Sequence, residues 1–203
     1  MLESPYQDCY NDNMKLRFVP NVPNILTLIR FLAIPVLAYL IYAGDDYNFA
    51  AFLLFVGIWL TDMLDGFIAR KFNQITEFGK LFDPLADKLF QLTTAVMMCV
   101  VGKLPIWVPL VIFFRELLMI IGSALLFKKE STVVFAQWYG KVGTVLFVVA
   151  FASLFFLTKD QSRLANYIFI VPILWSLYAC LRYAMAYLQP LVRKWFKPEQ
   201  PDG

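Results

Sequence analysis

The chain has 203 residues, and 60% of them are hydrophobic, a share well above ordinary globular usage. Histidine is absent, which excludes His-based catalytic triads and His-ligated zinc, and Cys9, Cys99 and Cys180 are too widely spaced for a zinc motif or a disulfide framework. The formal net charge is only +3, so the placement of the charges is more informative than their sum. This composition predicts an integral membrane protein.

The first 24 residues are polar and of mixed charge, and they lack the basic-then-apolar order of a signal peptide. We expect 1–24 to be a cytoplasmic or interfacial lead-in. Six apolar segments follow, each near the length that spans a bilayer. They cover approximately 25–43, 49–70, 82–101, 106–127, 139–157 and 164–188. The predicted fold is an all-α integral membrane protein, with a six-helix transmembrane domain at 25–189 and a basic cytoplasmic tail at 190–203.

The basic residues gather on one side of the six predicted membrane helices. The lead-in, the loops after the second and fourth segments and the tail share this side, whereas the other side holds Lys103, Lys159 and Arg163. Loops rich in lysine and arginine stay in the cytoplasm. We therefore expect a multi-pass protein of the inner (cytoplasmic) membrane with both termini in the cytoplasm.

Four aspartates lie around the junction of the second and third apolar segments: Asp62, Asp65, Asp83 and Asp87. The first two are three residues apart and share a helix face. Gly79 and the last two are spaced by four and share one stripe if their segment is helical. Proline fits best in the first turn of a helix. We therefore expect the third helix to begin only a few residues before Pro84, with Asp83 in its opening turn.

Two helices could thus present two carboxylates each to a common space. Mg²⁺ or Mn²⁺ would relieve the repulsion between them, because both ions prefer carboxylate and phosphate oxygens. Two ions could serve the four aspartates, as in two-metal phosphoryl transfer. Alternatively, the aspartates are helix-end caps or partners of Arg70, Lys80 and Lys88. That alternative explains one or two aspartates better than all four.

The pattern Asp62-x-x-Asp65-Gly66-x-x-Ala69-Arg70, then eight residues, then Gly79-x-x-x-Asp83-x-x-x-Asp87, resembles the signature of the CDP-alcohol phosphotransferase family. Every fixed position matches. The resemblance implies a CDP-diacylglycerol donor, two Mg²⁺ or Mn²⁺ ions on the four aspartates, and a homodimer. It further implies that Asp62, Gly66, Ala69, Arg70 and Gly79 bind the nucleotide. Asp87 is the predicted general base, because a positioned carboxylate can take a proton from an attacking hydroxyl.

Basic residues inside the apolar segments indicate a second anion. Arg30, Arg115 and Lys141 are the predicted cradle for a phosphate on the acceptor, because arginine in particular offers a fork of donors to phosphate. Alternatively, Arg115 forms an internal ion pair with Glu116. For Arg182, nearer the tail, structural pairing is at least as good an explanation.

Three further segments resemble the bacterial phosphatidylglycerophosphate synthase branch of the family: Asn21–Arg30, Phe114–Leu117 and Gly140–Thr144. This resemblance implies glycerol 3-phosphate as the acceptor. Gly143 stands where a basic residue is expected in that branch, and the stretch 61–89 also resembles cardiolipin synthases. The acceptor therefore stays open among glycerol 3-phosphate, phosphatidylglycerol, inositol phosphate and serine.

The expected reaction transfers the phosphatidyl group from CDP-diacylglycerol to glycerol 3-phosphate, giving phosphatidylglycerol phosphate and CMP, at a site that faces the cytoplasm. A membrane transporter or a diphosphate hydrolase could also carry intramembrane acids. Six segments without repeated halves, with all four acids in one block, fit poorly with the internal repeats of many transporters. No nucleic-acid partner is predicted.

Overall fold

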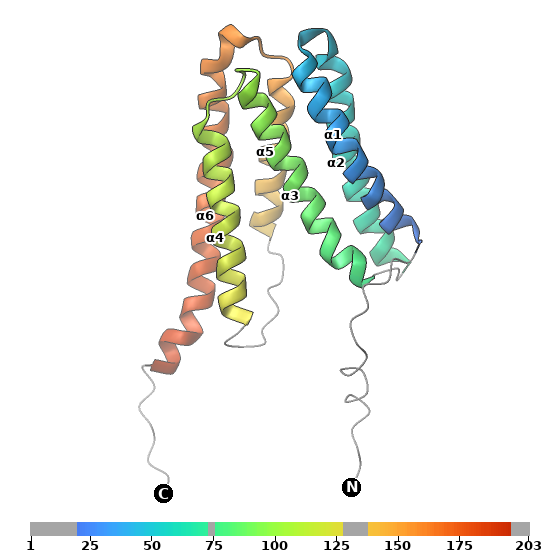
Figure 1. Ribbon diagram of the computed structural model, residues 1–203. Coiled ribbons are helices and arrows are strands. Elements are labelled where there is room, and N and C mark those ends of the chain that lie inside the picture. Colours follow the sequence, from blue (N-terminus) through green and yellow to red (C-terminus); the bar gives the residue numbers. More distant parts are fainter. Residues whose placement is uncertain (1–19, 73–75, 128–137, 196–203) are drawn as a thin grey trace, which may run out of the picture.

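The computed structural model describes residues 20–72, 76–127 and 138–195. Within these ranges the chain forms six α-helices and two short 3-10 helices and no strand, which confirms the predicted all-α architecture (Figure 1). Successive α-helices run in alternating directions along the bundle. The elements are α1 (Val22–Ala43), η1 (Asp45–Tyr47), α2 (Asn48–Lys71), α3 (Glu77–Val100), α4 (Trp107–Phe127), α5 (Trp138–Leu154), η2 (Lys159–Gln161) and α6 (Ser162–Trp195).

Local residues determine where α1 begins and ends and where α3 begins. The Asn21 side chain accepts a hydrogen bond from the Asn24 backbone N–H at 3.0 Å, which caps the first turn of α1. Gly44 ends this helix with φ of 103°, a conformation that favours glycine. Thr76 caps α3 by accepting from the Gly79 N–H at 3.0 Å. Both caps satisfy N–H groups that have no partner within their own helix.

The start of α3 corrects one prediction. The helix begins at Glu77, so Asp83 lies in its second turn and not in its opening turn, and Pro84 lies inside the helix. An interior proline removes one backbone hydrogen bond. Here the cap at Thr76 and the packing of α3 against α1 support the turns that precede the proline. Gly79, Asp83 and Asp87 therefore share a helical stripe, as their spacing predicted.

Helix α6 is also longer than its apolar run. It was expected to end near residue 188, but it continues through Pro190 to Trp195. The added turn contains leucine, arginine and lysine, which are favourable helix formers. The residues of the predicted lead-in up to position 19 and of the tail from 196 lie outside the described ranges.

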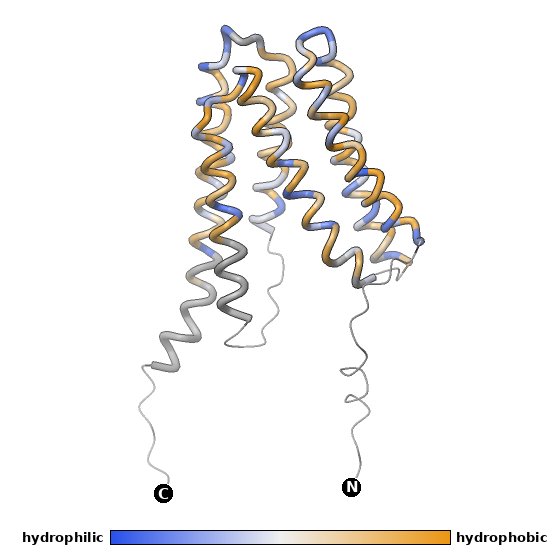
Figure 2. Tube along the Cα trace, viewed as in Figure 1, coloured by the Kyte–Doolittle hydropathy of each residue, from blue (hydrophilic) through white to orange (hydrophobic). Residues whose placement is uncertain are grey.

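Three stretches of the described chain are long and apolar enough to cross a membrane: Val22–Ala43, Asp45–Ala69 and Ser162–Arg182. Trp138–Leu154 is a shorter apolar helix. Many of their large apolar side chains point outward, such as Leu32 on α1, and Figure 2 shows hydrophobic residues along the length of the helices. Such surfaces are suited to contact with lipid tails, so the chain is a multi-pass membrane protein.

Aromatic side chains join the two parts of the bundle. Helix α1 packs mainly against α2 and α3, and α5 packs mainly against α6. Between these groups, the ring centroid of Phe55 on α2 lies 5.0 Å from that of Phe90 on α3 and 6.4 Å from that of Phe151 on α5. Phe151 in turn lies 5.0 Å from Phe169 on α6. All four side chains are buried, so this cluster fixes the spacing of the helices that carry the acids.

Candidate active site

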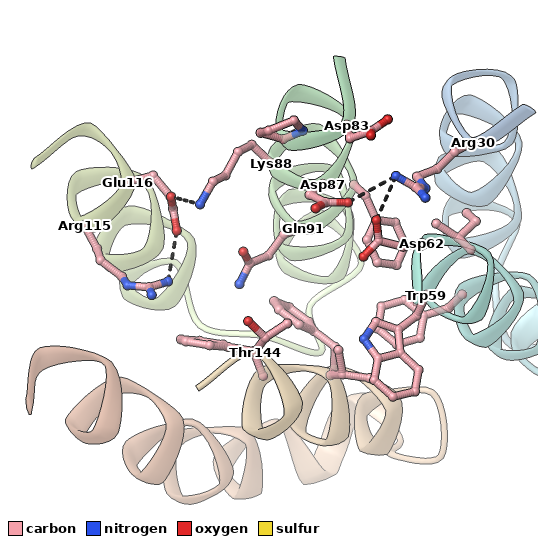
Figure 3. A pocket seen from close by; sticks show the side chains of 17 residues that line it. Arg30, Trp59, Asp62, Asp83, Asp87, Lys88, Gln91, Arg115, Glu116 and Thr144 are labelled. Carbon is pink, nitrogen blue, oxygen red and sulfur yellow. Dashed lines mark hydrogen bonds and ion pairs between the residues drawn. The ribbon is translucent and has the colours of Figure 1, made fainter. Parts of the chain in front are cut away.

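A cavity of about 290 Å³ lies among five helices, and three of the four aspartates of the sequence pattern line it (Figure 3). Helix α2 contributes Asp62, and α3 contributes Asp83 and Asp87. Further polar side chains from α1, α3, α4 and α5 complete its lining: Arg30, Lys88, Gln91, Arg115, Glu116 and Thr144. The structure thus brings acids from two helices into one space, as the spacing of the aspartates predicted, and places cations on two sides of them.

Arg30 lies at the centre of the acidic group. Its side chain comes from α1 and is fully buried. Nη1 lies 3.0 Å from Oδ1 of Asp62 and 3.3 Å from Oδ1 of Asp87, and Nη2 pairs with Oδ2 of Asp65. Asp65 is itself buried, at 3% exposure. One guanidinium therefore neutralises carboxylates from both α2 and α3, which makes their burial tolerable.

The fourth aspartate is held differently. The Thr27 hydroxyl hydrogen-bonds to Oδ1 of Asp83, and it also lies 3.0 Å from the Pro23 carbonyl oxygen. A hydroxyl has one proton, so it can donate to only one of these acceptors at a time. Thr27 is fully buried, and it lies one turn before Arg30 on the same face of α1. Helix α1 therefore contacts all four aspartates.

A second polar contact holds the beginning of α1 against the beginning of α3. The Thr76 hydroxyl donates to Oδ1 of Asn24 at 2.9 Å. Gly79 is buried beside this contact, and a Cβ added there would lie 3.2 Å from Asn24 Oδ1 and 3.4 Å from Asp83 Oδ2. The absence of a side chain at Gly79 thus permits the close approach of α1 to the helix that carries Asp83 and Asp87.

The opposite wall of the cavity carries a chain of charges. Arg115 Nη1 lies 2.9 Å from Oε1 of Glu116, and Oε2 of Glu116 pairs with Nζ of Lys88 on α3. The Arg115–Glu116 ion pair that the sequence left open is thus present, but it joins neighbours on α4. The Glu116–Lys88 pair is the one that links two helices. Arg115 also lies 5.7 Å from the centroid of the Phe147 ring, and its buried Nε has no hydrogen-bond partner among the described residues.

Not all predicted residues reach this cavity. Lys141 is exposed on α5, one turn before Thr144, and does not line the cavity. Gly66 and Ala69 are part-buried on α2 and also lie outside its lining. Gly143 is buried against Trp175 of α6, whose Cδ1 would lie 3.5 Å from an added Cβ, so this position faces α6. The side chains of Arg70 and Lys80 lie outside the described part of the structure.

The four aspartates are suitable ligands for a hard divalent cation, but three of them contact an arginine in this structure. Their carboxylate oxygens are the ligands that Mg²⁺ and Mn²⁺ prefer. Among the described residues, no three acidic or cysteine side chains are grouped closely enough to hold a metal ion. Arg30 lies between Asp62, Asp65 and Asp87 and is the cation that they contact. The donor atoms therefore fit such an ion in kind, and Arg30 is the cation that three of these acids contact in this structure.

Sequence reasoning missed the polar residues that position the acids: Asn24, Thr27 and Thr76. A signal was present, because Asn24, Thr27 and Arg30 recur every three residues and so fall near one face of a helix. An amphipathic stripe of this kind in an apolar segment indicates a partner helix with polar groups. The partner could not be read from the spacing, since Asp83 is 56 residues away along the chain.

Comparison with known proteins agrees with the geometry. The family model for CDP-alcohol phosphatidyltransferase matches residues 20–185. A probable phosphatidylglycerophosphate synthase of Mycobacterium tuberculosis (strain H37Rv) is 36% identical over 136 residues, which are 65% of this chain and 64% of that protein. A CDP-diacylglycerol–glycerol-3-phosphate 3-phosphatidyltransferase of Bacillus subtilis is 33% identical over 147 residues, covering 66% of this chain and 76% of that protein.

A relative with a different name is similar to about the same degree. The CMP-forming cardiolipin synthase of Streptomyces coelicolor is 32% identical over 140 residues, which are 67% of this chain and 65% of that protein. The similarity to each relative thus covers about two thirds of this chain, and the chain spans just under two thirds of the Mycobacterium and Streptomyces proteins. The family match extends over most of the chain and includes all four aspartates. The chain belongs to the CDP-alcohol phosphatidyltransferase family.

Proposed function

We propose that this protein transfers the phosphatidyl group of CDP-diacylglycerol to glycerol 3-phosphate, releasing CMP and forming phosphatidylglycerol phosphate. The observation that carries the proposal is the position of Asp62, Asp83 and Asp87 on one side of a cavity that has Arg115 on its other side. A diphosphate donor and a phosphate-bearing acceptor need two such regions, one for each anion. The relatives in Mycobacterium and Bacillus, which are named for this activity, support the same choice of acceptor.

The aspartates are the proposed donor side. Two Mg²⁺ or Mn²⁺ ions held by Asp62, Asp65, Asp83 and Asp87 would supply the positive charge that the diphosphate and the leaving CMP require. Asp62 together with Gly66, Ala69, Arg70 and Gly79 is the proposed nucleotide contact, as the family resemblance implies. The lipid tails of the donor would lie against the outward apolar faces of the helices.

Asp87 is the proposed general base. It lines the cavity next to Asp62, and its carboxylate is about half exposed, whereas Asp65 is buried. In the proposed step the sn-1 hydroxyl oxygen of glycerol 3-phosphate attacks the β-phosphorus of the donor. The bond between that phosphorus and the oxygen bridging to the α-phosphate breaks, CMP leaves, and Asp87 takes the hydroxyl proton.

Arg115, with Arg30 and Lys141, is the proposed site for the acceptor phosphate. Arg115 and Arg30 both line the cavity, and the buried Nε of each has no hydrogen-bond partner among the described residues. Arg115 has the stronger support, because the guanidinium of Arg30 contacts three aspartates whereas that of Arg115 contacts only Glu116 among the interactions described. Thr144 lies on the same wall and could donate a hydrogen bond to the acceptor. Lys141 lies one turn before Thr144 on α5 and would have to extend its side chain to reach the cavity.

We further propose that the cavity opens to the cytoplasm and that the protein is a homodimer of the inner membrane. The first proposal rests on the basic residues at the end of the bundle where α2 ends and α3 begins. The second rests on the family resemblance. A second acceptor, phosphatidylglycerol, is favoured by the Streptomyces relative, which is named a cardiolipin synthase.

An acceptor panel tests the reaction. Purified protein would be incubated with CDP-diacylglycerol, Mg²⁺ or Mn²⁺, and separately glycerol 3-phosphate, phosphatidylglycerol, inositol phosphate or serine. We expect CMP release and a new phospholipid with glycerol 3-phosphate alone. Equal CMP release without any alcohol would instead indicate a hydrolase, and product only with phosphatidylglycerol would indicate cardiolipin synthesis.

A further inference from the structure

Arg30 has an unusual place for a residue that is expected to bind the substrate. Its side chain is fully buried, and its guanidinium contacts Asp62, Asp65 and Asp87. These are three of the four acids that the family pattern assigns to metal binding. The same carboxylates therefore contact an arginine in this structure and would hold a divalent ion in the proposed reaction.

Charge balance explains why an arginine is needed here. Four carboxylates near one another in an apolar bundle repel, and buried charges are stable only when they are paired. Arg30 pairs with three of them, while Asp83 takes a hydrogen bond from Thr27. Among the described residues, Lys88 and Arg115 also line the cavity, but their ion-pair partner is Glu116. Arg30 is thus the cation that contacts the aspartates directly.

A divalent ion that takes these oxygens competes with Arg30 for them. Arginine cannot give way by losing its proton, because its pKa is above 12 in proteins. The guanidinium would therefore have to move away from any carboxylate oxygen that the ion takes. Arg30 already contributes to the cavity lining, so a space into which it can turn adjoins its present position.

We propose that Arg30 is an exchangeable counter-ion of the acidic site. Its guanidinium pairs with the aspartates when no metal is bound. When a divalent cation binds to the aspartates, the guanidinium leaves them and turns into the cavity. This inference rests on the proposed function for the presence of the metal, and it reconciles the buried Arg30 with a role toward the acceptor phosphate. Metal binding would then deliver a cation to the acceptor side of the site.

Replacement of Arg30 by methionine tests the exchange without any substrate. Wild-type protein and Arg30→Met, both purified in detergent, would be stripped of metal by a chelator and then titrated with Mn²⁺. Electron paramagnetic resonance would measure the free Mn²⁺, and the unfolding temperature would be recorded in parallel. We expect Arg30→Met to have a lower unfolding temperature without metal, a larger rise on adding Mn²⁺, and roughly tenfold tighter Mn²⁺ binding, a typical size for coupling between two binding events.

Arg115→Met is the matched control. It also removes one arginine from the cavity lining, but Arg115 contacts Glu116 and none of the four aspartates among the interactions described. We expect its Mn²⁺ affinity to stay within about twofold of wild type, because a charge that is not in contact is weakly coupled. Mn²⁺ binding by Arg30→Met that is unchanged or weaker than in wild type would overturn the exchange.

A measurement on the wild-type protein covers the case in which Arg30→Met does not fold. A small dicarbonyl reagent modifies accessible guanidinium groups, and mass spectrometry of the peptides reports each arginine separately. We expect labelling of Arg30 to rise severalfold with Mn²⁺, while labelling of the exposed Arg163 stays constant. Equal or lower Arg30 labelling with Mn²⁺ would contradict the proposal. Because neither readout uses a lipid or an acceptor, the acceptor panel can fail while the exchange holds.

Discussion

The Thr27 hydroxyl on α1 forms a hydrogen bond with the carboxylate of Asp83 on α3. One turn further along α1, Arg30 binds the remaining three aspartates. The first helix, which contains none of the family's aspartates, is therefore the element that orients all of them. Residues that orient the ligands of a metal site affect its affinity and activity strongly although they do not touch the metal.

Thr27→Val should lower transfer by about 10- to 100-fold, because Asp83 is a proposed metal ligand and this is the usual effect of losing a group that orients such a ligand. Valine keeps the branched shape of threonine but cannot donate to Asp83. Thr27→Ser keeps the hydroxyl and should retain most of the activity. The measurement is the rate of CMP release as a function of Mg²⁺ concentration, and a valine variant with the wild-type rate and metal dependence would contradict the role of this hydrogen bond.

Gly79→Ala should reduce both stability and transfer. The added Cβ would lie 3.2 Å from Asn24 Oδ1 and 3.2 Å from Thr76 Oγ1, so these side chains must shift, which disturbs the hydrogen bond that joins α1 to the start of α3. Gly57→Ala on α2 is the matched control, because nothing lies within 4 Å of its added Cβ. Alanine is a better helix former than glycine by about 1 kcal/mol, so the control should unfold at the same or a higher temperature. Thermal unfolding in detergent compares the two variants, and equal stabilisation of both would show that the helices have room at Gly79.

Asp87→Asn should abolish most transfer, by about 10²- to 10⁴-fold, because the amide cannot accept the hydroxyl proton. Binding of CDP-diacylglycerol should largely survive, since asparagine keeps the shape of the side chain and three other aspartates remain. Asp46→Asn, at an exposed position in η1, is the control for a lost carboxylate. Single-turnover rates and donor binding would be measured on each, and near-normal turnover of Asp87→Asn would refute the assignment of the base.

Arg115→Ala should raise the KM for glycerol 3-phosphate much more than it weakens donor binding. A hydrogen bond to a charged group contributes about 1.5–3 kcal/mol, which corresponds to a change in KM of roughly 10- to 100-fold where KM reflects binding. Arg163→Ala removes an exposed arginine at the beginning of α6 and should leave the KM unchanged. Initial rates across acceptor concentrations separate the two variants, and an unchanged KM in Arg115→Ala would argue against the phosphate cradle.

The fold and the acidic side of the site could be predicted from sequence because their signals are local. Apolar runs of membrane-spanning length gave six helices, and spacings of three and four placed the aspartates on shared faces. The predicted start of α3 was wrong, because it was placed from Pro84 alone. The helix begins at the Thr76 cap, eight residues before this proline. The contacts of Arg30 and Thr27 could not be predicted, since they depend on how α1 packs against helices far along the chain.

Aromatic side chains line the cavity at the part most distant from the start of α3. Helices α2, α3 and α5 place Phe55, Phe90 and Phe151 on the cavity lining, in each case further than Asp62, Asp87 and Thr144 from the end of the bundle where α3 begins. Their tightly packed rings oppose the passage of water and ions beyond this depth. The charged side chains of the cavity therefore lie on one side of a group of packed aromatic rings, which places apolar groups between them and the opposite end of the bundle.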